Sequence, residues 1–383
     1  MKILLDPQIF NSQKYGGISR YYTEIFSALF NKNKAEIEIP LYFTNNVYFN
    51  ESVLITKSQK KNSFLLRSLS NLGISIRKIT KKKNNSNAAK AMSHKEYDLF
   101  IPTYFDPYFL EHIGSKPFVL TVYDMIHELF PKYFESNDPI AKNKLLLMEK
   151  ATKIIAVSQN TKNDIIRIYP HIDAEKIEVI YHGNSIKIDP TISVQLPSNY
   201  ILFVGVRENY KNFNFFINAI NELLKNDPTL HVVCAGGGKF NQKEIQFIKS
   251  LGFENQIIHK NFKENELGQF YKKAKCFVFP SMYEGFGIPV LEAMACGCPI
   301  VLGHHSSFPE VAGNAGVYFD LNDSEDLKNK ISPLLNDENL RNDYIEKGFI
   351  QVQKFNWETA AEQCFELYKK AINKDSHFIH QKE

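Results

Sequence analysis

The chain has 383 residues, of which 44% are hydrophobic and 23% charged, a balance that is typical of a folded globular protein and excludes a disordered one. This length favours two domains of roughly 150 to 200 residues each, with a cleft between them that suits a small-molecule site. The net charge of +4 is too small to indicate a protein that binds nucleic acid.

No apolar run reaches the roughly 18 to 20 residues that a membrane-spanning helix needs, and Asp6 comes too early for the core of a signal peptide. We therefore expect a cytoplasmic protein. The five cysteines are odd in number and form no C-x-x-C pair, which favours buried apolar side chains over disulfides or metal ligands. They are Cys234, Cys276, Cys296, Cys298 and Cys364.

Short runs of β-branched and aromatic residues alternate with helical patterns along the whole chain. This alternation is typical of the α/β class, with parallel sheets flanked by helices. In the first half we predict strands over residues 2–9, 37–43, 98–104, 117–124, 153–158 and 176–183.

A second series of strands repeats this architecture, over residues 200–205, 230–236, 257–262, 276–281, 299–303 and 316–320. Between the two series, residues 186–199 contain Pro190 and Pro197 and show no helical periodicity, as expected of a linker. The sequence therefore predicts two Rossmann-like domains, residues 1–185 and 186–356, and a final helix over residues 357–373.

Paired glycines, Gly16 and Gly17, follow the first strand and precede a helical pattern. They indicate either a ligand-binding loop or an ordinary tight turn. The full G-x-G-x-x-G pattern is absent here, so we do not expect a nicotinamide or flavin cofactor.

Residues 57–83 combine many lysines and arginines with Leu65, Leu69, Leu72, Ile76 and Ile79 at helical spacing. One interpretation is a helix that lies on an anionic membrane surface. The alternative is an amphipathic helix whose apolar face packs on the domain core.

Polar residues follow the fourth predicted strand, where Asp124 and His127 are candidates for acid-base chemistry. The alternatives are a structural histidine and an aspartate that caps the next helix.

The loop after the first strand of the second domain, Gly205 to Asn212, contains two cations. Arg207 and Lys211 could together hold a diphosphate, or they could be ordinary surface cations. The triple glycine that begins at Gly236 admits a nucleotide or simply makes a turn.

The most informative stretch runs from residue 280 to residue 295 and reads as a strand, a glycine loop and a helix. Gly285 and Gly287 allow the backbone to approach a ligand, with Pro289 expected at the first helical position. Glu284 and Glu292 bracket the loop, the second within the first helical turn, and carboxylates accept hydrogen bonds from hydroxyl groups. The alternative is a solvated Glu284 and a Glu292 that complements the helix dipole.

With these residues in view, the sequence resembles the retaining glycosyltransferases of family 4, also called group 1, over nearly its entire length. The segment from Glu284 to Glu292 matches the E-x7-E motif of that family. The resemblance implies the GT-B fold, in which two Rossmann-like domains with parallel sheets face a central cleft and the final helix packs back onto the first domain.

The resemblance also implies roles for the candidate residues. Glu284 would bind donor hydroxyls with help from the Phe286 and Gly287 backbone, and Glu292 would hold the ribose. Arg207 and Lys211 would bind the donor diphosphate, and the Gly16–Gly17 loop would lie near the phosphate and the acceptor.

Two positions depart from the family pattern. Many members have an arginine where this chain has Val206, and a histidine where it has Tyr123. The second departure leaves open whether Asp124, His127 or neither lies near the transferred sugar.

The resulting expectation is a metal-independent, retaining hexosyltransferase that uses a GDP- or UDP-linked sugar as co-substrate and needs no other cofactor. The acceptor would be a glycan or a lipid-linked acceptor in surface polysaccharide or lipopolysaccharide synthesis, at the inner face of the membrane. The alternatives are another GT-B activity, a phosphorylase or an epimerase, and a non-catalytic module that binds nucleotide-sugar or glycan.

Overall fold

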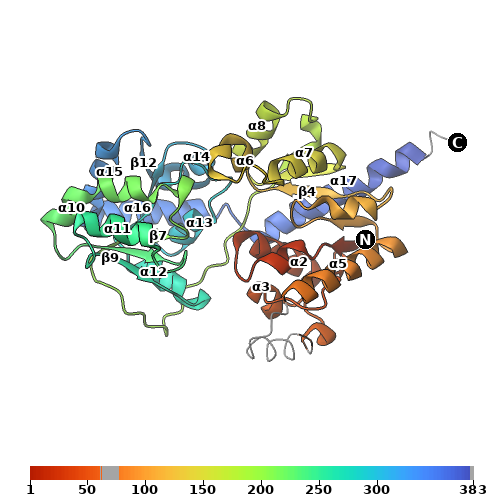
Figure 1. Ribbon diagram of the computed structural model, residues 1–383, viewed down its shortest axis with the longest axis horizontal. Helices are drawn as coiled ribbons and strands as arrows, with labels where there is room; N and C mark the ends of the chain where they lie inside the picture. Colours follow the sequence, from red (N-terminus) through yellow and green to blue (C-terminus); the bar gives the residue numbers. More distant parts are fainter. Residues whose placement is uncertain (61, 63–76, 380–383) are drawn as a thin grey trace. The chain divides into compact units, whose positions relative to one another are not determined.

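The computed structural model describes residues 1–60, 62 and 77–379. The chain divides into two compact units (Figure 1). Unit 1 comprises Met1–His182 and Trp357–Glu383, and unit 2 comprises Gly183–Asn356. Both are α/β, and each of the twelve predicted strands is present, shortened to three to five residues.

The strands of unit 1 form two parallel sheets of three strands, with the orders β2-β1-β3 and β4-β5-β6. A single bridge between Phe100 and Phe118 joins the sheets. The elements are β1 (Lys2–Leu5), α1 (Gln8–Ser12), α2 (Gly17–Asn31), β2 (Glu36–Glu38), α3 (Val47–Glu51), α5 (Arg77–His94), β3 (Leu99–Ile101), η1 (Pro107–Glu111), β4 (Val119–Val122), α6 (Ile126–Leu129), η2 (Pro131–Tyr133), α7 (Ile140–Lys150), β5 (Lys153–Ala156), α8 (Gln159–Ile168), η3 (Ala174–Lys176), β6 (Ile177–Val179) and α17 (Trp357–Ile379).

The first strand is shorter than the sequence predicts. The prediction that it runs to Ile9 is wrong, because β1 ends at Leu5 and α1 begins at Gln8. Pro7 explains the change, since it lacks an amide hydrogen for the sheet and has the helical backbone angles φ −81° and ψ −4°.

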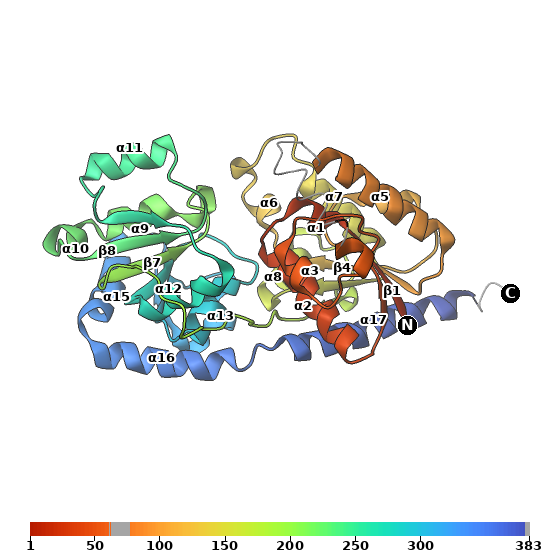
Figure 2. The ribbon, with the colours of Figure 1, turned by 90° about the horizontal axis from the view of Figure 1, so that it is seen from below.

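The last helix, α17, packs on α2 and so belongs to unit 1, as Figure 2 shows. Phe26 stacks on Tyr368 with ring centroids 6.3 Å apart, and Tyr21 meets Trp357 at 6.1 Å. The helix runs six residues beyond the predicted end at residue 373, because the sequence there has no glycine or proline to stop it.

The strands of unit 2 form one parallel sheet with the order β12-β11-β10-β7-β8-β9. The elements are β7 (Tyr200–Val204), η4 (Asn209–Lys211), α9 (Phe213–Ala219), α10 (Asn221–Asn226), β8 (His231–Ala235), α11 (Gln242–Leu251), β9 (Ile257–Lys260), η5 (Glu264–Glu266), α12 (Leu267–Lys273), β10 (Cys276–Phe279), α13 (Ile288–Ala295), β11 (Ile300–Gly303), α14 (Phe308–Ala312), η6 (Gly313–Ala315), β12 (Gly316–Phe319), α15 (Ser324–Asn336) and α16 (Glu338–Val352).

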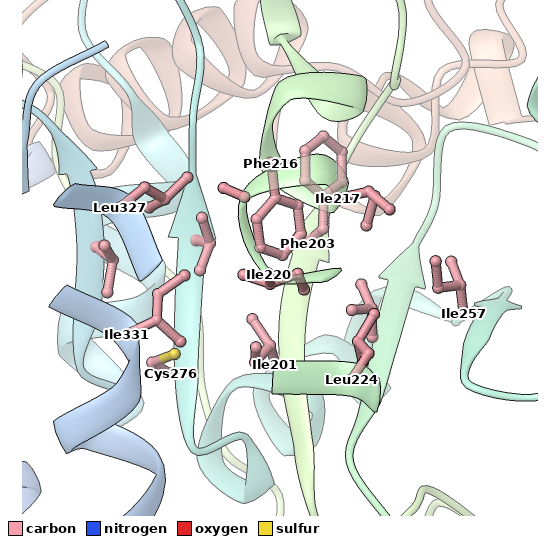
Figure 3. Close-up of a cluster of buried hydrophobic side chains, with 14 of the residues drawn as sticks. Ile201, Phe203, Phe216, Ile217, Ile220, Leu224, Ile257, Cys276, Leu327 and Ile331 are labelled. Carbon is pink, nitrogen blue, oxygen red and sulfur yellow. The ribbon is translucent and has the colours of Figure 1, made fainter. Parts of the chain in front are cut away.

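One face of this sheet packs under helices α9, α10 and α15 (Figure 3). Ile201 and Phe203 of β7 pack against the helices, and Phe216 of α9 and Ile331 of α15 pack against the sheet. All four side chains are buried. Burying each such side chain contributes about 1.5 to 3 kcal/mol, so this core holds the strand ends in fixed positions.

All five cysteines are buried with free thiols, which confirms the expectation of buried apolar side chains.

The basic segment lies only partly within the described residues, because residues 61 and 63–76, with Leu65, Leu69, Leu72 and Ile76, fall outside them. Helix α5 packs inward through Thr80, Asn84, Ala88 and Met92, while Ile79 is 68% exposed. Ile79 therefore does not pack on the core as the amphipathic alternative required. Within the described ranges, no helix combines the length and apolar composition needed to cross a bilayer.

Candidate functional site

The carboxyl ends of the central strands form the candidate ligand-binding edge of unit 2. β7 pairs with β8 on one side and with β10 on the other, so the strand order reverses at β7. In open parallel sheets, ligands bind beyond the carboxyl ends of the strands where the order reverses. The loops after β7, β8 and β10 carry most of the site residues predicted in this domain, namely Gly205, Arg207, Lys211, Gly236, Glu284, Gly285, Phe286 and Gly287.

The triple glycine lets the loops after β7 and β8 approach each other closely. Gly237 has a φ of +69°, and a β-carbon there would lie 2.2 Å from the carbonyl oxygen of Gly205. Only glycine meets both requirements without displacing backbone. The triple glycine thus makes a close turn, and nucleotide binding at Gly236 stays a prediction.

Arg207 lies behind this turn, with its side chain only 2% exposed. Its Nε donates to Oε1 of Glu244 at 2.7 Å, and Nη1 and Nη2 donate to the carbonyl oxygens of Gly236 and Gly238 at 3.1 and 2.8 Å. The alternative of an ordinary surface cation is therefore wrong for Arg207. The guanidinium ties the β7 loop to the glycine turn and to the first turn of α11.

Lys211 and Glu284 meet at the end of the sheet although they are 73 residues apart in sequence. The Lys211 Nζ donates to Oε1 of Glu284 at 2.5 Å, and each side chain is 15% exposed. The ammonium also lies 5.0 and 5.2 Å from the ring centroids of Tyr210 and Phe279. A cation in such a partly desolvated position interacts strongly with any anion that reaches it.

The loop after β10 ends in a helix whose N-terminus faces the same edge. Gly287 is the N-cap of α13 with a φ of +95°, a left-handed conformation that favours glycine. Pro289 is the second helical residue, one later than predicted, because the helix begins at Ile288. The first amides of a helix have no partner within it, and together with the helix dipole they attract anions.

Two serines that the sequence analysis missed hold this loop from the end of β11. Ser307 is buried, and its hydroxyl lies 3.0 Å from the carbonyl oxygen of Glu284 and 2.9 Å from that of Phe286. The Oγ of Ser306 accepts a hydrogen bond from the Glu284 amide at 3.4 Å. The available signal was a pair of serines in the loop that follows a predicted strand.

Glu292 is 5% exposed and lies deeper than predicted. It is the fifth residue of α13, so its predicted place in the first helical turn is wrong. Its Oε2 accepts a hydrogen bond from the hydroxyl of Tyr271 at 3.1 Å. The alternative that Glu292 complements the helix dipole required a place in the first turn, which Glu292 does not occupy.

In unit 1, the paired glycines lead into α2. Gly16 is the N-cap and Gly17 the first residue of that helix. The carboxamide of Gln13, which the sequence analysis did not single out, folds back and accepts a hydrogen bond from the Ser19 amide at 3.1 Å. A β-carbon at position 16 would lie 2.3 Å from this Gln13 oxygen, so glycine makes room for the cap.

Asp124 lies in the turn between β4 and α6, and His127 is the second residue of α6. The Asp124 carboxylate accepts a hydrogen bond at 3.1 Å from the amide of Ile126, the first residue of α6, while the N-cap of that helix is Met125. His127 stacks on Phe134 with centroids 3.9 Å apart, and its Nε2 lies 3.6 Å from Asp138. Burial, followed by the charge of Lys144, lowers the pKa of His127, which favours the neutral imidazole at neutral pH.

A buried carboxyl group, Asp6, lies at the carboxyl end of β1 and was not predicted as a site residue. It accepts hydrogen bonds from the Tyr108 hydroxyl at 2.6 Å and from the Thr103 amide at 3.3 Å. Burial raises the pKa of Asp6 to about 7.

In the described part of the chain, no three His, Cys, Asp or Glu side chains converge as metal ligands do. Unit 2 carries the Lys211–Glu284 pair at the carboxyl edge of its own sheet, and unit 1 carries Asp124 after β4. That the two units enclose one cleft stays a prediction.

Two family profiles match the sequence. The one described as "Glycosyltransferase Family 4" matches residues 66–186, and the one described as "Glycosyl transferases group 1" matches residues 186–351. The chain is 28% identical over 291 residues to the O-antigen chain mannosyltransferase B of Escherichia coli, covering 72% of this chain and 75% of that protein. It is 30% identical over 234 residues to the O-antigen chain mannosyltransferase RfbU of Salmonella typhimurium, covering 57% and 65%.

Solved structures share the fold across almost the whole chain. Anabaena Alr3699/HepE in complex with UDP-glucose superposes with a TM-score of 0.69 at 20% identity, covering 97% of this chain and all of that one. Sucrose-phosphate synthase from Thermosynechococcus elongatus gives a TM-score of 0.70 at 18% identity, covering 96% and 98%. The two profiles together span residues 66–351, and with the parallel sheets described above they show that the chain is a glycosyltransferase of family 4 (group 1) with the GT-B fold.

Proposed function

We propose that this glycosyltransferase moves a hexosyl group from a nucleotide diphospho-sugar to a glycan or lipid-linked acceptor, with retention of anomeric configuration and without a metal ion. The observation that carries the proposal is the Lys211–Glu284 pair, which lies at the strand-order reversal beside the N-terminus of α13. A departing nucleoside diphosphate accumulates negative charge, and a cation with convergent amide hydrogens stabilises it.

The proposed binding step is an exchange of partners. Without donor, Glu284 neutralises Lys211 at 2.5 Å. A donor diphosphate competes for the Lys211 ammonium, and the released Glu284 carboxylate then accepts hydrogen bonds from sugar hydroxyls. The same pair thus links recognition of the diphosphate to recognition of the sugar.

Arg207 has a different part in this proposal from the one expected. Its nitrogens already donate to Glu244 and to the glycine turn, so it holds that turn in place beside the diphosphate. Glu292 is proposed to bind the ribose, with Tyr271 orienting its carboxylate.

Independence from a metal is supported by what Lys211 and α13 can supply. An ammonium and the first amides of a helix provide positive charge where many phosphoryl-transfer sites use Mg²⁺. Full activity in excess EDTA is the expected result, and a loss that added Mg²⁺ restores would contradict it.

The acceptor is proposed to be a growing surface polysaccharide, as the names of the O-antigen mannosyltransferases among the relatives suggest. GDP-mannose is therefore the first donor to test, and UDP-glucose the second, since a structure of the same fold holds it.

Membrane contact is proposed through the exposed Ile79 and Lys81 to Lys83 of α5. Sedimentation with anionic but not neutral vesicles tests that contact.

The decisive experiment incubates the full chain with each donor and a panel of mannosyl- and glucosyl-terminated acceptors. Release of nucleotide together with a lengthened glycan is expected, and the anomeric coupling constant of the product reports retention. Nucleotide binding without any release identifies a non-catalytic module instead. A requirement for inorganic phosphate identifies a phosphorylase.

A further inference from the structure

A lysine that the sequence analysis did not notice lies beneath the end of β4. Lys144 of α7 has a side chain that is 0% exposed. Its Nζ donates to the backbone carbonyl of Asp124 at 2.8 Å and to Oε2 of Glu128 at 2.9 Å. The same nitrogen lies 3.9 Å from the Asp124 carboxylate and 5.3 Å from the ring centroid of Phe105.

Stability alone does not explain a lysine at this position. Taking an ammonium out of water is costly, and replacing a buried ion pair by apolar side chains is often neutral or stabilising. Glu128 is also buried, with its side chain 3% exposed, so both charges lose their hydration. The ion pair instead fixes the orientation of its partners, because the donors of one ammonium hold several acceptors in place.

Both hydrogen-bond acceptors of the Lys144 ammonium, Asp124 and Glu128, lie within the six residues that follow β4. Asp124 and Glu128 are the two ends of this turn, and His127 lies between them. The turn has little other regular structure to hold it, since α6 comprises only Ile126–Leu129. An anchor from α7 therefore sets where the groups at the carboxyl end of β4 point.

We propose that Lys144 is a positioning residue for the transfer reaction, which fixes Asp124 and His127 at the acceptor side of the site through the turn it anchors. The inference rests on the proposed function, because these two groups matter only if unit 1 contributes to sugar transfer. It assigns no substrate contact to Lys144 itself, which is buried.

The test compares Lys144→Met, Glu128→Gln and the double variant with a matched control, Lys153→Met. Lys153 is also buried in unit 1 and donates to a carbonyl, that of Glu175, at 2.8 Å. It begins β5, so it lies at the opposite edge of the sheet from the Asp124 turn. Each variant is measured for unfolding in urea, for hydrogen exchange of the amides 123–129, and for kcat and donor KM.

The double variant separates structure from positioning, because it removes both buried charges together. We expect it to recover most of the stability that Lys144→Met loses, while the amides 123–129 exchange faster and kcat falls by up to about 100-fold. Donor KM stays within about twofold of the wild type, since unit 2 holds the donor. Lys153→Met is expected to lose stability without loss of kcat in the folded protein.

Recovery of kcat together with stability in the double variant would overturn the proposal, as would an equal loss of kcat in Lys153→Met. Unchanged exchange of the amides 123–129 would also overturn it, whether or not the enzyme is active. If the wild type transfers no sugar from any donor, the proposed function fails, and the exchange measurement still decides whether Lys144 anchors the turn.

Discussion

Glu284→Gln is expected to tighten the binding of a nucleoside diphosphate while it slows sugar transfer. In the wild type, a diphosphate must draw Lys211 away from the Glu284 carboxylate, 2.5 Å from its Nζ. Glutamine keeps the shape of the side chain but removes the charge that competes. Lys211 is then available to the ligand at a lower cost.

The size of the expected change in Kd follows from the burial of the Lys211–Glu284 pair. Exposed ion pairs contribute about 0.2 to 1 kcal/mol, and breaking a fully buried pair costs about 3 to 5 kcal/mol. Both side chains here are 15% exposed, which places the pair between these limits. We take about 1.5 kcal/mol as the free energy of the Lys211–Glu284 interaction that a diphosphate must replace, so Kd for GDP or UDP should fall about tenfold in Glu284→Gln.

Lys211→Met is expected to act in the opposite direction, because it removes a charge-assisted hydrogen bond to the diphosphate. Such bonds contribute about 1.5 to 3 kcal/mol, so Kd should rise about 10- to 100-fold. In the double variant the Glu284→Gln change should have no effect, since no lysine remains for it to release.

Isothermal titration of the full chain with GDP and UDP measures all four proteins. Glu222→Gln is the matched control, because Glu222 forms a pair of similar length with Lys328, at 2.6 Å, on another part of unit 2. That control should leave Kd unchanged. If Glu284→Gln weakens binding as much as Lys211→Met does, the exchange of partners is refuted.

Three further outcomes follow from the structure. Gly237→Ala should destabilise unit 2 by about 1 to 3 kcal/mol in urea unfolding and weaken nucleotide binding, because its β-carbon would meet the Gly205 carbonyl; an unchanged variant would contradict the close turn. Asp6→Asn should cost less stability at pH 8 than at pH 4. The pKa of Asp6 is near 7 in the folded protein and lower in the unfolded chain, so the wild type loses up to about 4 kcal/mol of unfolding free energy as the pH rises from the unfolded to the folded pKa. A stability difference between the variant and the wild type that does not change with pH would contradict the raised pKa. Burial raises the pKa of the Cys234, Cys276, Cys296 and Cys364 thiols to about 12, so iodoacetamide at pH 8 should label none of them in the native protein and all of them in urea.

The strands could be predicted because each is a short β-branched or aromatic run between turn residues. The end of β1 was misplaced because the apolar pattern continues through Ile9, although Pro7 had already stopped the sheet. The glycine loop before α13 was recognisable for a similar reason, since Gly287 and Pro289 carry local backbone information. Such features depend on neighbours in sequence.

The contacts within the site depend on residues far apart in the chain. Nothing in the loop from Gly205 to Asn212 indicates that Arg207 pairs with Glu244 while Lys211 pairs with Glu284. Lys144 gave no signal either, because one lysine in a helix is ordinarily solvated. Its burial is decided by the packing of α7 against β4, which the sequence pattern does not reveal.

Hydrogen exchange of the full chain, with and without GDP-mannose or UDP-glucose, tests most directly whether unit 2 takes up a nucleotide sugar at the strand-order reversal. Slower exchange is expected in residues 205–212, 236–238 and 282–290, the three segments that carry or flank the Lys211–Glu284 pair. Protection confined to other segments, or no protection at donor concentrations that support transfer, would contradict it.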